Sequence, residues 1–174
     1  MGKMLDPMAV ATACQCTAHQ PNVTANLPIL ATAMTKYGYH PELHTNLWIA
    51  VLATVAVETA HQFAPIAEMG SSEYLQSQTY WPFIGRGFVQ TTWQNNYQEV
   101  ADALDIDCVA HPELLLEPVN AANALMIFYT DRPALIAAAH DANWRETRRL
   151  VNGGYNGWPA YSTALGNLIH LAQS

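Results

Sequence analysis

The sequence predicts a single, mainly α-helical domain with a short β excursion. Its 174 residues are enough to enclose one compact hydrophobic core. Of these, 51% are hydrophobic and only 12% are charged, against about 25% charged in ordinary soluble domains. Residues 47–57 form an apolar run without a charged side chain. A helix that is apolar on all faces lies at the centre of a domain.

The N-terminal part is expected to hold three helices, at about 7–17, from 22 or 24 to 37, and at 43–60. Asp6 can cap the first of them, with Pro7 in its first turn. Pro21 is expected to break the chain between the first two helices, and Gly38 to end the second. The third helix contains the apolar run and is therefore the expected core element.

The C-terminal part is expected to be helical at about 93–104, 119–130, 134–140, 143–151 and 159–172. Residues 62–84 are expected to be irregular, because prolines and glycines interrupt every apolar pattern there. The β excursion is expected around Gly85 and Gly87. Asn-Gly pairs at 152–153 and 156–157 indicate a helix end and a turn.

Charge and cysteine content argue against several classes of partner. The formal net charge of −7 disfavours nucleic acid, because phosphate contacts need an excess of Lys and Arg. The apolar run is about half the length of a membrane span, so no membrane insertion is expected, and we expect a monomer. The chain has three cysteines, an odd number: Cys14, Cys16 and Cys108. This indicates free structural thiols in a protein synthesised in a reducing compartment.

The start of the sequence carries no signal-peptide pattern, so synthesis in a cytoplasm is expected. A second methionine stands at position 4. Residues 1–5 are therefore candidates for a disordered or added leader. The single domain is expected to span residues 1–174 with that exception.

Two carboxylates, Glu58 and Glu68, are the main candidates for chemistry. Glu58 closes the apolar run, whereas Glu68 follows Pro65 in a wetter segment. This contrast is what divides a carboxylate pair into a proton donor and a proton acceptor, as the hydrolysis of a glycosidic bond requires. From spacing alone, the alternative is that Glu58 pairs with a basic residue such as Arg86 and that Glu68 is a solvated loop residue.

A second group of polar side chains comprises Gln90, Thr92 and Asn96. If residues 90–92 are extended, Gln90 and Thr92 project on one side. Their amides and hydroxyl can orient a water molecule and bind a sugar; the alternative is the polar edge of a hairpin. Several aromatic residues can stack on sugar rings, and about half are expected in the core instead: Tyr80, Trp81, Trp93, Tyr97, Tyr155 and Trp158.

Metal and cofactor chemistry find little support in the sequence. Glu58 and His61 have the spacing of a di-iron ligand pair, but such sites need the pattern twice, and no second Glu-x-x-His exists. No phosphate-binding loop, dinucleotide fingerprint or nucleophile elbow is present. No cofactor and no metal are expected.

Four motifs resemble glycoside hydrolase family 19, which contains chitinases and phage endolysins of lysozyme-like fold. Residues 56–63, AVETAHQF, are similar to the family's A-H-E-T-G-G-F. Residues 63–71, FAPIAEMGS, resemble the endolysin stretch F-x-P-I-x-E-x-G-S. Residues 83–97 and 144–158 resemble Y-x-G-R-G-x-I-Q-L-T-x-x-x-N-Y and W-x-x-x-R-R-x-V-N-G-G-x-N-G.

The resemblance implies a lysozyme-like helical fold and an inverting mechanism. Glu58 would be the general acid and Glu68 the general base, with Thr92 helping to place the water. Inversion implies carboxylates roughly 6.5–9.5 Å apart. The remaining residues implied or proposed to contact the substrate are Gln90, Asn96, Asn152, Arg86, Tyr97 and Trp81.

Three departures from the family pattern stand out. Ala60 and His61 replace a glycine pair, which is expected to reshape the cleft near the acid. The loop between Ser71 and Gly85 is short. No arginine follows Arg149, whereas many members carry a late arginine near the acid, and Arg86 is the candidate to replace it.

The resemblance implies a substrate of β-1,4-linked N-acetylhexosamines. Peptidoglycan is preferred to chitin because the 63–71 stretch is of the endolysin type. A phage lysin is made in the host cytoplasm and reaches the bacterial cell wall through a separate pore. Two alternatives stay open: a chitinase, and a catalytically impaired sugar-binding module of the cell wall.

Overall fold

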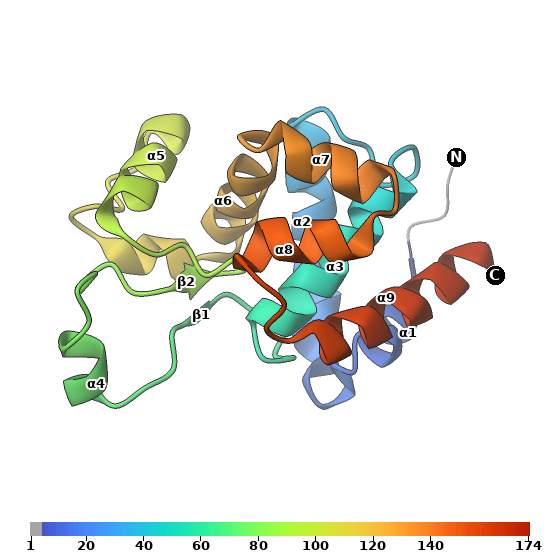
Figure 1. Cartoon of the computed structure of the whole chain (residues 1–174), viewed down its shortest axis with the longest axis horizontal. Coiled ribbons are helices and arrows are strands. Elements are labelled where there is room, and N and C mark those ends of the chain that lie inside the picture. Colours follow the sequence, from blue (N-terminus) through green and yellow to red (C-terminus); the bar gives the residue numbers. More distant parts are fainter. Residues whose placement is uncertain (1–4) are drawn as a thin grey trace.

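The computed structural model describes residues 5–174 and confirms the mainly α-helical fold (Figure 1). In this range the α-helices are α1 Pro7–Ala13, α2 Gln20–Lys36, α3 Thr45–Glu58, α4 Ser72–Gln76, α5 Gln94–Leu104, α6 Pro118–Thr130, α7 Pro133–His140, α8 Trp144–Asn152 and α9 Trp158–Gln173. Two 3₁₀ helices and two strands accompany them: η1 Thr17–His19, η2 Pro112–Leu116, β1 Ile66–Ala67 and β2 Arg86–Gly87. The leader expected at residues 1–5 lies, for residues 1–4, outside the described part of the chain.

Helix bounds near the N-terminus follow local capping. Asp6 caps α1 as expected, because its carboxylate accepts a hydrogen bond from the N–H of Ala9 at 2.9 Å. The helix ends at Ala13, earlier than expected, and Gln15 has a positive φ of 56° just beyond it. The prediction that Pro21 breaks the chain is wrong. Pro21 lies in the first turn of α2, where a missing N–H leaves no partner unsatisfied.

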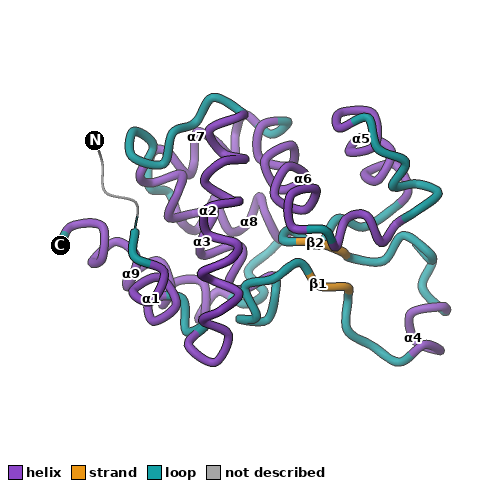
Figure 2. The backbone as a smooth tube through the Cα atoms, turned by 180° about the vertical axis from the view of Figure 1, so that it is seen from behind, coloured by secondary structure: helices purple, strands orange, loops and turns teal. Residues whose placement is uncertain are grey.

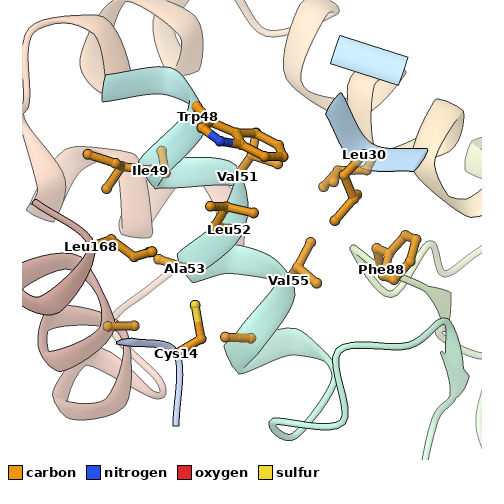
Figure 3. Close-up of a cluster of buried hydrophobic side chains, with 14 of the residues drawn as sticks. Cys14, Leu30, Trp48, Ile49, Val51, Leu52, Ala53, Val55, Phe88 and Leu168 are labelled. Atoms are coloured by element: carbon orange, nitrogen blue, oxygen red, sulfur yellow. The ribbon is translucent and has the colours of Figure 1, made fainter. Parts of the chain in front are cut away.

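Helix α3 is the centre of the fold, as its composition predicts. Every residue from Leu47 to Ala56 is buried. Figure 3 shows its side chains facing Leu30 of α2, Leu168 of α9 and Phe88 of the loop after β2. Each fully buried aliphatic or aromatic side chain contributes about 1.5–3 kcal/mol. The last residue of α3, Glu58, is therefore attached to the most firmly packed element.

A second, smaller core lies on the other side of a short antiparallel ribbon. In the ribbon, Ile66 of β1 pairs with Gly87 of β2, and Ala67 pairs with Arg86. Figures 1 and 2 show α4 and α5 beyond this ribbon, apart from the bundle around α3. The smaller core is made of Tyr97, Val100, Ala101, Cys108, Leu115 and Ala124. One of its members, Ala124, belongs to α6, so the smaller core joins α5 and η2 to the bundle beside the ribbon.

The cysteines are buried and free, as the sequence indicated. Burial raises the pKa of the Cys14 thiol strongly and that of Cys16 to about 12, so both stay protonated at neutral pH. Within residues 5–174, no three His, Cys, Asp or Glu side chains gather where they could hold a metal ion. No helix of that range is long and apolar enough to cross a membrane.

Candidate active site

Glu58 is partly buried and forms an ion pair with a basic residue, as the alternative from spacing proposed, but the partner is Arg148 and not Arg86. Only 16% of its side chain is exposed, and Nη1 of Arg148 donates to its Oε1 at 2.6 Å. Arg148 comes from α8, which lies beside the end of α3 and the ribbon (Figures 1 and 2). The pair therefore ties two helices together at the site.

Arg148 is itself held rigidly. Its side chain is 2% exposed, and its Nε donates to the backbone oxygen of Asn156 at 2.9 Å. Nη2 donates to the same oxygen, and the guanidinium lies 5.5 Å from the ring centroid of Tyr161. Gly157 makes this approach possible, because a Cβ there would lie 3.2 Å from Nη2 of Arg148 and 2.9 Å from a methyl of Val57. The loop after α8 is thus fastened to the carboxylate through one arginine.

Arg86 does not replace the late arginine of the family, and that expectation is corrected. Its Nη1 donates to the backbone oxygen of Pro82 at 3.1 Å and to the hydroxyl of Tyr97 at 2.8 Å. It forms no ion pair with Glu58, which pairs with Arg148 instead. Arg86 therefore braces its own loop.

Tyr97 was expected to contact substrate and does not have the position for it. Its side chain is fully buried, and its hydroxyl donates to the backbone oxygen of Ile84 at 2.7 Å. Its ring packs edge-on against Phe83 at 5.2 Å. The residue belongs to the smaller core. Trp81 is 44% exposed and stays a candidate for substrate contact.

Glu68 lies just after β1, and the ribbon fixes it. Its N–H donates to the backbone oxygen of Gly85 at 2.7 Å, while the N–H of Gly85 donates back to its Oε2 at 3.1 Å. The hydroxyl of Tyr80 donates to Oε1 at 2.8 Å. Donors on both carboxylate oxygens stabilise negative charge there. The side chain is therefore oriented as an acceptor.

Gln90 and Thr92 do converge, although Gln90 does not meet the condition of an extended backbone. Gln90 has a positive φ of 56°, and its Nε2 donates to the backbone oxygens of Ile66 and Gly87 at 2.9 and 3.1 Å. A Cβ on Gly85 would lie 2.9 Å from Oε1 of Gln90 and 3.3 Å from Oγ1 of Thr92. Because the N–H of Gly85 also binds Glu68, this glycine is the point where the three side chains gather.

Asn96 lies in the first turn of α5 and completes the polar group. Its Nδ2 donates to the backbone oxygen of Thr92 at 2.7 Å, and the Thr92 hydroxyl donates to that of Gln90 at 2.8 Å. Gln90, Thr92 and Asn96 line one cavity of about 140 Å³ together with Phe128 and other residues. The three predicted residues therefore face a common space.

Asn152 ends α8, four residues after Arg148, so both project from one helix face. Its Oδ1 is buried and accepts no hydrogen bond within the described part of the chain. A buried acceptor without a donor is costly unless a ligand or water supplies one. A larger cavity of about 860 Å³ lies at the other end of α3, near Thr45, and none of the candidate residues lines it.

The turn after Glu58 keeps the backbone that a glycine pair would adopt. Ala60 and His61 have positive φ values of 48° and 62°. Nδ1 of His61 lies 3.0 Å from the backbone oxygen of Cys14, just after α1. The His61 side chain thus lies against α1. Because residues with a Cβ are strained at positive φ, the departure from the family's glycine pair introduces backbone strain at Ala60 and His61.

Replacing Ala60 with glycine should stabilise the protein by about 0.5–1 kcal/mol, because relief of the left-handed strain exceeds the extra entropy of an unfolded glycine. The melting temperature should rise by roughly 1–4 °C. The matched control is Ala103→Gly in α5, where φ is helical and the same exchange should cost about 0.5–1 kcal/mol. If the melting temperature changed equally in Ala60→Gly and Ala103→Gly, the backbone at Ala60 would not be strained.

Two functional candidates escaped the sequence reasoning. Arg148 stood in the motif of residues 144–158, but its partner is 90 residues away, and no local pattern reveals such a pair. For Tyr80 the sequence indicates only stacking on a sugar, and no pattern in it shows that the hydroxyl binds Glu68. Partial burial and this hydrogen bond raise the pKa of Tyr80 to about 12, so the phenol remains a donor at neutral pH.

The fold belongs to the class seen in bacterial chitinases. Solved structures of this shape include a mutant form of chitinase C, with a TM-score of 0.72 and 19% identity over 100% of this chain and 78% of that one. Chitinase C from Streptomyces griseus HUT6037 has a TM-score of 0.69 and 21% identity, over 99% of this chain and 77% of that one. A bacterial family 19 chitinase has a TM-score of 0.64 and 23% identity, over 86% of this chain and 84% of that one. No family model and no curated protein matches the chain.

Proposed function

We propose that this chain is a glycoside hydrolase that cleaves β-1,4 bonds between N-acetylhexosamines. The observation that carries the proposal is the pair of differently held carboxylates. Glu58 is partly buried beside Arg148, and Glu68 is oriented by the ribbon, next to Gln90 and Thr92. The chitinase-like fold supports the same class of reaction.

In the proposed mechanism the neutral form of Glu58 protonates the leaving oxygen from Oε2, the carboxyl oxygen that Arg148 does not contact, and Glu68 takes a proton from the attacking water on the opposite face. Arg148 would then stabilise the negative charge left on Glu58. The Thr92 hydroxyl donates its hydrogen to the backbone oxygen of Gln90. Its lone pairs are therefore free to accept a hydrogen bond from that water. Such a one-step displacement inverts the anomeric configuration.

The substrate proposed first is peptidoglycan, with the bacterial cell wall as the place of action. Its support is the likeness of residues 63–71 to the endolysin stretch. Chitin oligomers are the second candidate, favoured by the three chitinases of similar fold. The two polymers share the acetamido sugar that the amides of Gln90, Asn96 and Asn152 suit.

The proposal is tested by the release of reducing ends from purified peptidoglycan and from chitin oligomers. Glu68→Gln should lower the rate about 100- to 10,000-fold, as the loss of a general base does. Glu73→Gln, on exposed helix α4, is the matched control and should leave the rate unchanged. NMR of the first product should show the α-anomer. Saturable oligosaccharide binding without turnover by the wild type would select a binding module instead.

A further inference from the structure

Trp93 is an exposed aromatic residue that contacts the ring of Tyr80, thirteen positions earlier in the sequence. Its side chain is 49% exposed, although a large indole would ordinarily be buried. Its ring meets that of Tyr80 edge-on, with centroids 5.2 Å apart and planes at 65°. The hydroxyl of Tyr80 in turn binds Glu68. The indole therefore lies one side chain away from the candidate base.

The backbone of Trp93 is strained to hold this position. Its φ of 75° and ψ of 141° fall in a region that residues other than glycine rarely adopt. Two hydrogen bonds hold it there: its N–H donates to the oxygen of Phe83 at 2.9 Å, and its own oxygen accepts from Tyr97 at 3.2 Å. Such strain persists where the surroundings impose it, and it gathers at functional sites.

Tyr80 needs external support because it lies in the loop between α4 and β2. Its backbone oxygen accepts a hydrogen bond from Phe83 at 2.7 Å, but no regular element contains it. Of its ring contacts within residues 5–174, the edge-on pairing with Trp93 is the aromatic one. The pair would restrict the phenol to the orientation in which its proton reaches Glu68.

We infer that Trp93 is a positioning residue, which acts through Tyr80 to orient the carboxylate of Glu68. The inference rests on the proposed function, since it assigns Glu68 the part of the base. It is a mechanical role: Trp93 aligns a donor, and the donor aligns the acceptor that must face the attacking water. Misplacement of a reacting group lowers the rate of the chemical step rather than the binding of substrate.

The first test separates kcat from KM in Trp93→Ala, Trp93→Phe and Tyr80→Phe. An edge-on aromatic contact corresponds to about a 2- to 12-fold effect, so Trp93→Ala should lower kcat by that factor with KM unchanged. Trp93→Phe should restore most of kcat. Adding Trp93→Ala to Tyr80→Phe should cost nothing further. A fully additive double variant, or a change in KM alone, would overturn the inference.

A second measurement does not depend on turnover. Tyr80 is labelled with ¹³C at Cζ, assigned by the loss of its signal in Tyr80→Phe, and titrated. In the wild type its pKa is raised to about 12 by partial burial first and then by the hydrogen bond and charge of Glu68. Trp93→Ala should bring the onset of titration to lower pH, toward the ordinary value. An unchanged titration overturns the inference, whereas absent turnover alone overturns only the proposed function.

Folding is controlled with Trp93→Gly, which removes the same side chain and relieves the backbone strain. It should melt at a higher temperature than Trp93→Ala, yet lose as much kcat. If the kcat of the two variants followed their melting temperatures instead, the residue would be merely structural. Leu43→Ala changes an exposed apolar residue in the turn before α3 and should change neither quantity.

Discussion

Glu58→Gln should lower kcat by about 100- to 10,000-fold, the usual contribution of a positioned general acid. Glutamine has nearly the same shape and its carbonyl can still accept from Nη1 of Arg148, so the fold should remain. What it lacks is the proton that the leaving oxygen needs. The measurement is initial-rate release of reducing ends, wild type beside variant, with circular dichroism as the check on folding.

The matched control for that loss is Glu42→Gln, which changes an exposed acid in the turn before α3. It should retain the wild-type rate. Full activity in Glu58→Gln would remove the residue from the mechanism, even if the chain proved to be a hydrolase. A loss of both activity and structure would instead place Glu58 among the residues that hold α3 and α8 together.

Elements whose signal lies within a few residues were predicted well. The apolar run of α3 and the cap at Asp6 depend on local spacing, and both were found. The buried state of Tyr97 was also within reach. Tyr97, Val100, Ala101 and Leu104 follow the spacing of one helix face, which indicates packing. The aromatic ring of Tyr97 also suits stacking on a sugar, and that interpretation favoured substrate contact over the helical spacing.

Other features depend on contacts between distant segments and leave no local trace. The pairing of Arg148 with Glu58 exists because α8 packs beside the end of α3, which only the assembled fold determines. The positive φ of Gln90 follows from the hydrogen bonds between Arg86 and Thr91 that close the loop after β2. Side chains therefore converge on Gly85 through a tight turn, where the sequence pattern suggested an extended strand.

The glycine pair that the family carries after the acid illustrates the limit of residue matching. Ala60 and His61 differ in type from glycine, yet both have the positive φ values that glycine adopts without strain. The fold imposes the conformation because the His61 N–H still bonds the oxygen of Ala56 at 2.7 Å. A substitution that looks disruptive in the sequence is thus absorbed as backbone strain.

Arg148→Met should destabilise the protein by about 3–5 kcal/mol, because removing one partner of a buried ion pair leaves the other charge uncompensated. Glu58 would lose the hydrogen bond from Nη1 of Arg148. The backbone oxygen of Asn156 would lose the hydrogen bonds from Nε and Nη2. At this chain length each kcal/mol lowers the melting temperature by roughly 2–4 °C. A fall of roughly 6–20 °C in thermal unfolding is therefore expected.

Arg149→Met is the matched control, since Arg149 is the next residue and also forms an ion pair, with Glu146 at 2.6 Å. That pair is exposed, so its loss should leave the melting temperature unchanged. The double variant Glu58→Gln with Arg148→Met should lose less than the sum of the single variants, because no unpaired charge is then buried. Equal losses in Arg148→Met and Arg149→Met would mean that the pair at Glu58 is as well solvated as a surface contact, and the oriented acid proposed for catalysis would lose its support.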